Sequence, residues 1–546
     1  MQKTKLDIKI KSKALEGLNA EQEQAVTHGK GPLLIVAGAG TGKTTVITRR
    51  IAYLIEQGVK PEAILAMAFG EKAAAEMAER VDLLLPYGYY NLQVSTFHSF
   101  CERMLKEYGL EVGLPDFKVL DEVGQWLLIR NNLDKFDLDY YRPLGNPTRF
   151  IRALVSHFAR CKDELITTKE YLGFAEKVRL NLDGAEAGVA MTPSSPPPHE
   201  GEEEGVSDAD EMNRIQEVAN AYHVYQRLLL QNGALDFGDL IFYALDLVKK
   251  RPKILDKLRA QYEYIMIDEF QDTNFAQYEL VRLLAAPRNN LTVVGDDDQS
   301  IFKFRGASIS NILHFQKDYP KAKFISLTQN YRSGQKILDL AYEFIKQNDP
   351  DRLEVKLKID KKLKATPLLS SPTGGEELKE GGIIEHYKFD DYIAEAGGVV
   401  EKILEIKNKS DLSSNSSPSP GEEGRSWNDF AILARSHDTL EPFINKLDEA
   451  QIPYIYFANR GLYRKPIILD LISYFKLLDN YHEASALYRV LNFPVFGIEY
   501  EAIVELSHYA KKKSLSLFEA LKAFASDPSL FPSHKGREKE AGIHEL

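Results

Sequence analysis

The chain has 546 residues, 44% of them hydrophobic and 27% charged, with a formal net charge of −11; at roughly 150 residues per domain, this length predicts three or four domains. No stretch approaches the roughly 18 uncharged apolar residues of a membrane span, and the Lys-rich start MQKTKLDIKIKSK lacks the apolar stretch of a secretory signal. The two cysteines, Cys101 and Cys161, are too few for a disulfide scaffold or a cysteine-rich metal site, so we expect a soluble, cytoplasmic protein without a membrane partner.

The apolar segments alternate with helical patterns. A first apolar run meets a glycine-rich turn and then a helical stretch through Ile55, and similar short runs recur before other helix-like segments. Such alternation predicts a parallel sheet covered by helices on both faces. The region from about 106 to 234 instead reads as mainly helical. The predicted strands are 33–36, 64–69, 93–97, 264–267 and 291–294, and the clearest helices of the helical region are 125–133 and 217–230.

The negative charge is concentrated in one segment. Residues 181–213 contain nine Asp and Glu but no Lys or Arg, so the rest of the chain carries −11 + 9 = −2. Net charge therefore does not exclude a basic groove for nucleic acid. The segment includes TPSSPPPHEGEEEG, which is too poor in apolar residues to fold, and it predicts a solvated insertion over about 184–211. Related low-complexity pieces occur at 370–382 and 411–426, with a looser version at 527–542.

The most specific local motif is AGAGTGKTT, which follows the first predicted strand and opens a helix. Glycines at these positions let backbone N–H groups approach phosphates, Lys43 can pair with the terminal phosphates, and the Thr44 hydroxyl can bind Mg²⁺. The strict phosphate-loop pattern has glycine where this chain has Ala37. The residues predicted to bind the nucleotide here are Ala37, Gly38, Ala39, Gly40, Thr41, Gly42, Lys43, Thr44 and Thr45.

A pair of carboxylates after another predicted strand can complete this site. YIMIDEFQDTN places Asp268 and Glu269 directly after an apolar run. Asp268 would hold Mg²⁺ and Glu269 would orient or deprotonate the attacking water. An Asp-Glu pair after a strand is common in solvated loops, and only its combination with the phosphate loop makes it specific.

Seven motifs in this order resemble the UvrD/Rep/PcrA group of superfamily 1 DNA helicases. The resemblance covers nearly the whole chain apart from the insertions. It implies a P-loop NTPase of the α/β class, with tandem RecA-like motor domains, parallel sheets and helical insertion subdomains. The motifs are LNAEQEQAV (18–26), AGAGTGKTT (37–45), FGEKAAAEM (69–77), STFHSF (95–100), IDEFQDTN (267–274), VVGDDDQSIFKFRGA (293–307) and LTQNYRS (327–333).

The resemblance assigns roles around the nucleotide. Gln22 matches an adenine-recognition glutamine, and Tyr331 matches the aromatic residue that stacks on the base. Arg332 matches an arginine that reaches the γ-phosphate, and Gln299 a glutamine that senses it. Asp296 to Asp298 are expected to be loop carboxylates rather than a second metal site. Without the family, Gln22 would be read as an exposed helix residue.

For DNA, the resemblance implies aromatic stacking platforms, which bind single strands with little sequence preference. Phe69, Phe302 and Phe304 occupy these positions, and the last two replace the more usual Tyr and Trp. His98 matches a position near the DNA backbone. Without the motif, each Phe could equally be a core residue.

Several departures from the family pattern bear on function. Glu71 stands where the family has Asn and would place negative charge near phosphates, and Glu499 replaces a glycine of a turn that contacts duplex DNA. Two later family motifs, one contacting DNA and ATP and one carrying a second γ-phosphate arginine, are not found before Leu546. HKGRE at 534–538 is only a partial match.

The resemblance predicts four parts of the chain and one main activity. The activity is ATP- and Mg²⁺-dependent 3′ to 5′ movement on single-stranded DNA with unwinding at single-strand/duplex junctions, in repair or replication. A chain that binds ATP and DNA with little turnover is the alternative, and a nuclease fusion is a weaker third reading. The predicted parts are a first motor domain (1–105 and 235–317), a helical insertion (106–234), an incomplete second motor domain (318–463) and the start of a helical accessory subdomain (464–546).

Overall fold

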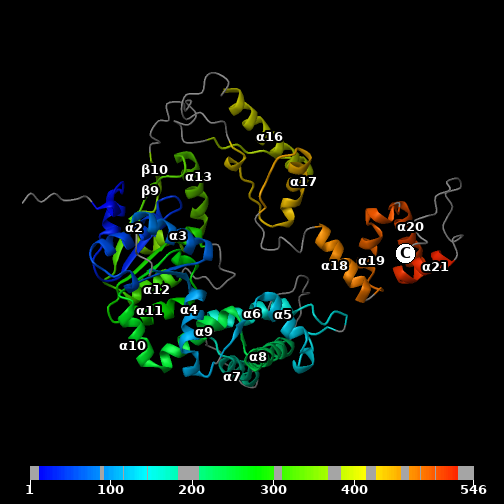
Figure 1. Cartoon of the computed structure of the whole chain (residues 1–546), viewed down its shortest axis with the longest axis horizontal. Helices are drawn as coiled ribbons and strands as arrows, with labels where there is room; N and C mark the ends of the chain where they lie inside the picture. Colours follow the sequence, from blue (N-terminus) through cyan, green and yellow to red (C-terminus); the bar gives the residue numbers. More distant parts are fainter. Residues whose placement is uncertain are drawn as a thin grey trace, which may run out of the picture. The chain divides into compact units, whose positions relative to one another are not determined.

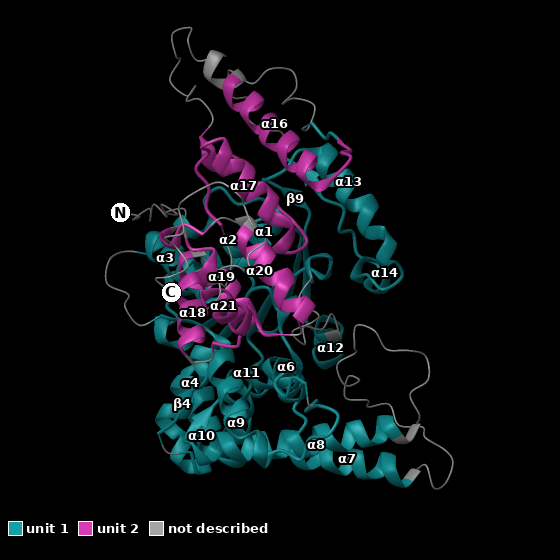
Figure 2. Cartoon of the chain, turned by 90° about the vertical axis from the view of Figure 1, so that its right-hand side faces the viewer, with its two compact units in different colours: residues 1–385 teal, residues 386–546 magenta. Residues whose placement is uncertain are grey.

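A computed structural model of the chain divides into two compact units, residues 1–385 and 386–546 (Figure 2). Within the described residues, no helix is long and apolar enough to cross a membrane. The structure describes residues 12–85, 92–114, 116–143, 145–181, 208–300, 310–366, 383–413, 426–456, 466–479, 481–498, 500–513 and 515–526.

The first unit is built on a six-stranded parallel sheet (Figure 1). Five of its strands are those predicted from apolar runs, and β1, β2, β6 and β7 are buried along their whole length. Strands buried on both faces read as continuous apolar runs, which is why the sequence located them. In spatial order the strands are β3 (Gln93–Thr96), β2 (Ile64–Ala68), β6 (Tyr264–Ile267), β7 (Leu291–Gly295), β1 (Leu33–Ala37) and β8 (Lys323–Leu327).

Alternate strand residues enter two separate cores, one on each face of the sheet. Leu34 and Val36 of β1 belong to one core, whereas Leu33 and Ile35 belong to the other. The helices on the Leu33 face are α1 (Ala20–Val26), α2 (Lys43–Glu56) and α3 (Glu71–Leu84). Those on the opposite face are α4 (Phe97–Tyr108), α9 (Phe237–Lys250), α10 (Pro252–Gln261), α11 (Phe275–Ala285) and α12 (Ser310–Asp318).

The helical region expected between strands forms a core of its own. Phe158 stacks on Tyr222 and Tyr225, each with ring centroids 5.2 Å apart. Most of the acidic insertion predicted over about 184–211 lies outside the described residues, but α8 begins at Asp208, so 208–211 are helical and not part of a solvated loop. The elements are β4 (Lys118–Val119), α5 (Glu122–Arg130), α6 (Ile151–Asp163), α7 (Thr168–Asn181), α8 (Asp208–Gln231) and β5 (Ala234–Leu235), with β4 parallel to β5.

The segment after α12 first adds a sixth strand, β8, to the sheet and then continues into elements outside it. β8 pairs with β1, although the sequence-based boundary assigned residues from 318 onward to the second motor domain. Next come β9 (Gln329–Asn330), α13 (Gln335–Ile345), α14 (Leu353–Leu357) and β10 (Lys364–Ala365), and β10 lies parallel to β9.

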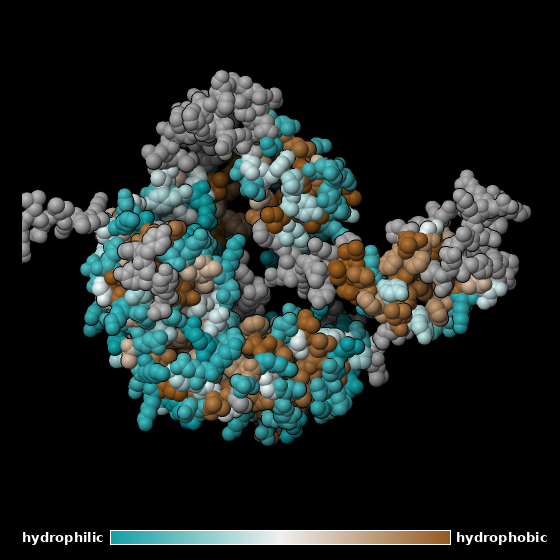
Figure 3. Space-filling view, in the orientation of Figure 1, coloured by the Kyte–Doolittle hydropathy of each residue, from teal (hydrophilic) through white to brown (hydrophobic). Residues whose placement is uncertain are grey.

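Within the described residues of the second unit, the regular elements are helices. Leu487, Leu491, Ile503 and Phe524 belong to its larger core. Helix α18 leaves an apolar stripe exposed, which includes Ile467 and Phe475 at 67% and 64% exposure and is visible as a brown area in Figure 3. The helices are α16 (Tyr392–Ser413), α17 (Glu441–Glu449), α18 (Pro466–Asp479), α19 (Ala484–Leu491), α20 (Tyr500–Lys513) and α21 (Leu517–Ser526).

Candidate nucleotide-binding site

The loop between β1 and α2 has the backbone that a phosphate site requires. Gly40 and Gly42 adopt φ values of 74° and 88°, in the left-handed region that favours glycine. The Thr41 hydroxyl donates to the Gly38 carbonyl at 2.8 Å and braces the turn. Gly42 is the N-cap of α2, so the amides of the first helical turn and the positive end of the helix dipole face the loop.

The Lys43 ammonium lies at the centre of the site. Its Nζ donates to Glu269 Oε2 at 2.7 Å and to Gln299 Oε1 at 3.0 Å. Three predicted site residues from β1–α2, the end of β6 and the end of β7 therefore meet at one atom. A terminal phosphate that binds Lys43 would compete with both partners.

Asp268 lies beside the hydroxyl predicted to share a metal with it. Thr44 Oγ1 donates to Asp268 Oδ2 at 3.2 Å, so a hydroxyl and a carboxylate oxygen stand together at the mouth of the loop. Such hard oxygen donors suit Mg²⁺. Burial, together with the neighbouring Glu269 charge, raises the pKa of Asp268 to about 6. A cation at this position would favour the ionised carboxylate.

A hydrogen-bonded chain connects Glu269 to the loop after β7. Gln271 Nε2 donates to Glu269 Oε2 at 2.8 Å, and Gln271 Oε1 accepts from the Asp296 amide at 3.0 Å. Gln299 Nε2 in turn donates to Asp296 Oδ2 at 2.8 Å. These hydrogen bonds fix the loops at the carboxyl ends of β6 and β7 relative to each other next to Lys43.

Gln22 is 4% exposed, so its reading as an exposed helix residue is wrong. Its Nε2 donates to the Thr41 carbonyl at 2.9 Å, and its Oε1 accepts from the Asn19 amide at 3.2 Å within a capping box. Asn19 Nδ2 also donates to the Tyr331 hydroxyl at 2.9 Å. The two residues predicted to contact the base, Gln22 and Tyr331, thus share Asn19 as a neighbour. Gln22 would have to exchange these bonds to read an adenine edge.

Strand β9 and the bend after it, which carries Arg332, pack directly on the phosphate loop. The Tyr331 amide donates to the Gly40 carbonyl at 2.9 Å, and Asn330 Nδ2 donates to the Ala39 carbonyl at 2.6 Å. A Cβ on Gly40 would lie 2.7 Å from Arg332 Cβ, so only glycine permits this approach. Arg332 itself is exposed beside the loop.

The residues predicted to contact DNA are only partly described. Phe69 and His98 follow β2 and β3, which pair at Ala68 and Thr96, so both lie at the same edge of the sheet. Both are half-buried, and His98 makes an edge contact with Phe237 with centroids 5.6 Å apart. Burial lowers the pKa of His98 despite the nearby Glu71. Phe302, Phe304 and Glu499, like the partial motif at 534–538, lie outside the described residues.

The carboxylate of Glu71 is held at the start of α4. Glu71 Oε1 accepts from Thr96 Oγ1 at 2.8 Å and from Ser99 Oγ at 2.6 Å. These hydroxyl hydrogen bonds lower the pKa of Glu71, which keeps it ionised. Its negative charge therefore stands at the edge of the sheet that carries His98.

Two contributors to the site were not identified from the sequence. Gln271 lies within IDEFQDTN but had no assigned role, although its side-chain amide joins the Glu269 carboxylate to the backbone N–H of Asp296. Asn330 precedes the predicted Tyr331 and Arg332, and its contact with Ala39 depends on the close approach of two distant segments. Nothing in the local sequence predicts that approach.

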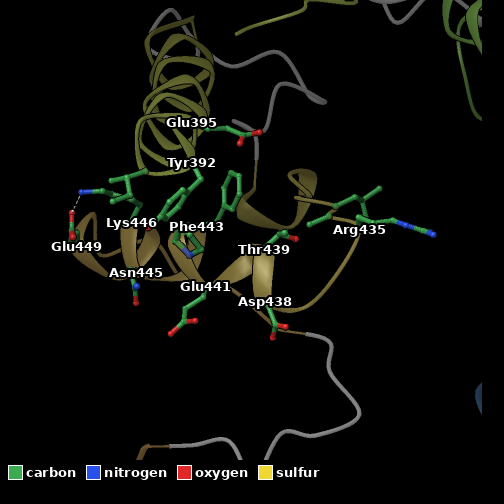
Figure 4. Close-up of a pocket in the computed structure, with 14 residues that line it drawn as sticks. Tyr392, Glu395, Arg435, Asp438, Thr439, Glu441, Phe443, Asn445, Lys446 and Glu449 are labelled. Carbon is green, nitrogen blue, oxygen red and sulfur yellow. Dashed lines mark hydrogen bonds and ion pairs between the residues drawn. The ribbon is translucent and has the colours of Figure 1, made fainter. Parts of the chain in front are cut away.

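A cavity of about 920 Å³ in the second unit is not part of this site (Figure 4). It is lined by side chains from α16 and from the segment before and within α17, including Tyr392, Arg435 and Phe443. No predicted site residue lines it. The contacts around Lys43 therefore define the candidate site.

Comparison with known proteins identifies the family of the chain. The model of the UvrD/REP helicase N-terminal domain matches residues 18–320, and that of the UvrD-like helicase C-terminal domain matches residues 325–527. The chain is 34% identical over 509 residues to the ATP-dependent DNA helicase PcrA of Staphylococcus aureus (strain Mu50 / ATCC 700699). It is 35% identical over the same length to the protein of that name from Staphylococcus epidermidis (strain ATCC 12228 / FDA PCI 1200).

Each match covers 93% of this chain but 60% of the relative, so the chain spans about 60% of the length of the curated relatives it matches. The fold class predicted from the sequence is confirmed, because both family domains match in tandem and the first contains the phosphate loop on a parallel sheet. The chain belongs to the UvrD/Rep family of ATP-dependent DNA helicases.

Proposed function

We propose that this chain is the ATP-hydrolysing part of a DNA motor that moves 3′ to 5′ on single-stranded DNA and opens duplex at junctions, in repair or replication in the cytoplasm. The observation that carries the proposal is the convergence of Glu269 and Gln299 on Lys43, next to the Thr44–Asp268 pair. This set contains a phosphate-binding cation, a metal-binding pair and a base for water.

The proposed reaction transfers the γ-phosphoryl group of ATP to water. Lys43 binds the terminal phosphates, and Glu269, released from Lys43, orients the attacking water and takes its proton. Arg332 lies against Gly40 and would add positive charge where negative charge develops. Thr44 and Asp268 would hold Mg²⁺, which supplies charge neutralisation on the phosphates.

The proposed DNA contacts are aromatic residues near the carboxyl ends of the strands. Phe69 and His98 lie at that edge of the sheet in this structure, and Phe302 and Phe304 follow Gln299 along the chain. A base stacked on an aromatic side chain contributes about 1–3 kcal/mol without sequence preference. Gln299 would connect these platforms to the γ-phosphate because it touches Lys43 and precedes Phe302 by three residues.

ATP hydrolysis by the purified chain, with and without single-stranded DNA, tests this proposal. We expect DNA to stimulate turnover and Lys43→Ala to lower kcat by about 100-fold or more, because it removes the main cation of the site. Lys60→Ala, at an exposed lysine after α2, is the matched control. Direction is tested by comparing unwinding of duplexes with a 3′ tail and with a 5′ tail. Binding of ATP and DNA with turnover at the Lys43→Ala level would instead support the binding-only alternative.

A further inference from the structure

Two buried cationic side chains next to the site have no role so far. Arg352 precedes α14 and Lys361 follows it, and they are 3% and 7% exposed. Arginine and lysine are almost never buried to this extent unless they are paired. Both belong to the first unit, as does the nucleotide site.

Lys361 lies among three carboxylates of the loop after β7. Its Nζ is 2.6 Å from Asp296 Oδ1 and 2.9 Å from Asp298 Oδ2, and it also donates to Asp297 Oδ1. Burial opposes the charged ammonium, but the three aspartates outweigh it and raise the pKa of Lys361. The triplet could hold a metal by its spacing, yet a cation of the chain itself occupies it, in line with its expected role as loop carboxylates.

Arg352 binds the same loop through Asp298. Its Nε and Nη2 donate to Asp298 Oδ1 and Oδ2, both at 2.8 Å, in a bidentate pair. The next residue adds a backbone contact, because the Leu353 amide donates to Asp297 Oδ2 at 2.7 Å. A planar guanidinium fixes both the position and the orientation of a carboxylate, which a lysine cannot do.

The loop that contains Asp296, Asp297 and Asp298, here called the aspartate loop, is hydrogen-bonded to the nucleotide site. Asp296 binds Lys361 through Oδ1 and accepts from Gln299 Nε2 through Oδ2. Gln299 Oε1 then accepts from Lys43. One short path of polar contacts therefore runs from Lys361 through Asp296 and Gln299 to the phosphate-binding ammonium.

The other end of the same segment reaches β9, the strand that immediately precedes Arg332. β10 pairs with β9, and the Thr366 amide donates to the Asn330 carbonyl at 2.8 Å. Leu363 packs on the phosphate loop, since a Cβ on Gly38 would lie 2.9 Å from its Cδ1. Residues 352–366 thus connect the aspartate loop, the phosphate loop and β9, which immediately precedes Arg332.

We propose that Lys361 and Arg352 are positioning residues of the ATP site, which hold Gln299 toward Lys43 and couple the loop after β7 to the segment that carries Arg332. The inference rests on the proposed ATP hydrolysis and adds to it the residues that transmit a change at Lys43. When a phosphate takes the place of Gln299 on Lys43, the loop is released on one side and still held by Lys361 and Arg352 on the other. The change at Lys43 is then passed to residues 352–366.

The first test measures kcat and KM for ATP with and without single-stranded DNA in Lys361→Met and Arg352→Lys. Neither side chain contacts the phosphate loop in the described contacts, so we expect DNA-stimulated kcat to fall about 10-fold while KM changes less than about 3-fold. Lys361→Arg should restore part of the rate. Lys362→Met is the matched control, because Lys362 is half exposed and its nearest carboxylate, on Asp339, is 3.4 Å away. Equal rates in Lys361→Met and Lys362→Met would overturn the proposal.

Thermal unfolding of each variant separates positioning from loss of fold. Lys361→Met leaves the buried Asp296 and Asp297 carboxylates without their cation, whereas Arg352→Lys keeps the charge and removes the planar guanidinium that contacts Asp298 and Glu354. A fall in kcat with Arg352→Lys at an unchanged melting temperature supports the proposal. A fall in kcat that only follows the unfolded fraction contradicts it.

Amide hydrogen exchange of the nucleotide-free protein tests the positioning role if the parent chain does not turn over ATP, in which case the proposed function itself fails. The amides of Gln299 and Arg332 are both hydrogen-bonded in this structure. Arg352→Lys should speed exchange at 297–300 and at 329–333 together, and Lys362→Met at neither. No change at 329–333 would show that the two segments are not coupled.

Discussion

Glu269 carries backbone strain at the centre of the site. Its φ of 49° lies in the left-handed region, which costs a residue with a Cβ roughly 1–2 kcal/mol. Asp268 Oδ1 accepts from the Glu269 amide at 3.0 Å and holds this turn. In this strained backbone conformation the Glu269 carboxylate contacts Lys43 and Gln271. The strain is therefore located at the residue proposed to act as the base.

Replacing Glu269 by glutamine should separate binding from turnover. Glu269→Gln keeps the size and the hydrogen-bonding oxygen but removes the proton acceptor, and general-base catalysis contributes about 10²–10⁴-fold. We expect kcat for ATP to fall by at least about 100-fold, with binding of ATP at least as tight, because Lys43 loses a competing carboxylate. Single-turnover hydrolysis and nucleotide titration measure the two quantities.

Glu263→Gln is the control, since Glu263 immediately precedes the same strand and only approaches Lys30 at 3.9 Å. If Glu269→Gln retained turnover near the parent rate, another group would have to be the base.

At the scale of elements, the helical region is joined to the sheet helices through buried charge. Lys162 of α6 lies 2.6 Å from Asp236 Oδ2 and 2.8 Å from Asp239 Oδ1, at the start of α9. Tyr225 of α8 donates to Asp236 Oδ2 at 2.9 Å. Next to Lys162, Asp163 accepts from Asn274, the N-cap of α11, at 2.6 Å. One buried cluster thus fixes α6 and α8 against α9 and α11.

Removing the cation of this cluster should destabilise the first unit strongly. Lys162→Met leaves Asp236 and Asp239 buried without a counter-charge, which typically costs about 3–5 kcal/mol. We expect a clear drop in the urea midpoint. Replacing both aspartates by asparagine in the same variant should recover most of the loss, because it removes the unpaired charge.

Lys177→Met, at an exposed position of α7, serves as the comparison. A midpoint of Lys162→Met equal to that of Lys177→Met would mean that the cluster contributes nothing to stability.

The strands and the phosphate loop could be predicted because they depend on local pattern. Continuous apolar runs located β1, β2, β6 and β7, and the glycines located the loop. Burial of charge could not be predicted, because Lys361 stands in KIDKKLK among other lysines and only the fold selects it. Likewise, Gln22 is buried against Thr41, and no local pattern in the sequence predicts this contact between two separate segments.

At the scale of the whole chain, the acidic segment separates two helices that pack on each other. Figure 2 shows α7 and α8 side by side, and Tyr171 and Tyr222 face one another with ring centroids 6.4 Å apart. The helices are therefore held by their own side chains. The length of chain between 181 and 208 enters stability mainly through loop closure, which changes by only about 0.6 kcal/mol per doubling of length.

Replacing residues 184–205 by a short Gly/Ser linker should accordingly leave the fold intact. We expect the free energy of unfolding to change by less than about 1 kcal/mol and ATP hydrolysis to stay at the parent rate. Chemical denaturation and the ATPase assay check both. A large loss of stability would show that the acidic segment makes contacts that the protein needs.

The order of strands in the sheet determines when the ATP site can form during synthesis. β1 is made first among the strands, but its neighbours β7 and β8 end at residues 295 and 327. At about 5–20 residues per second, the roughly 290 residues between β1 and the end of β8 take the ribosome on the order of 15–60 s to add. Until β7 is complete, LLIVA has no partner on either edge, while the helical region can fold from nearer contacts. A nascent chain must therefore keep an aggregation-prone strand unpaired and cannot build the nucleotide site until Arg332 has been translated.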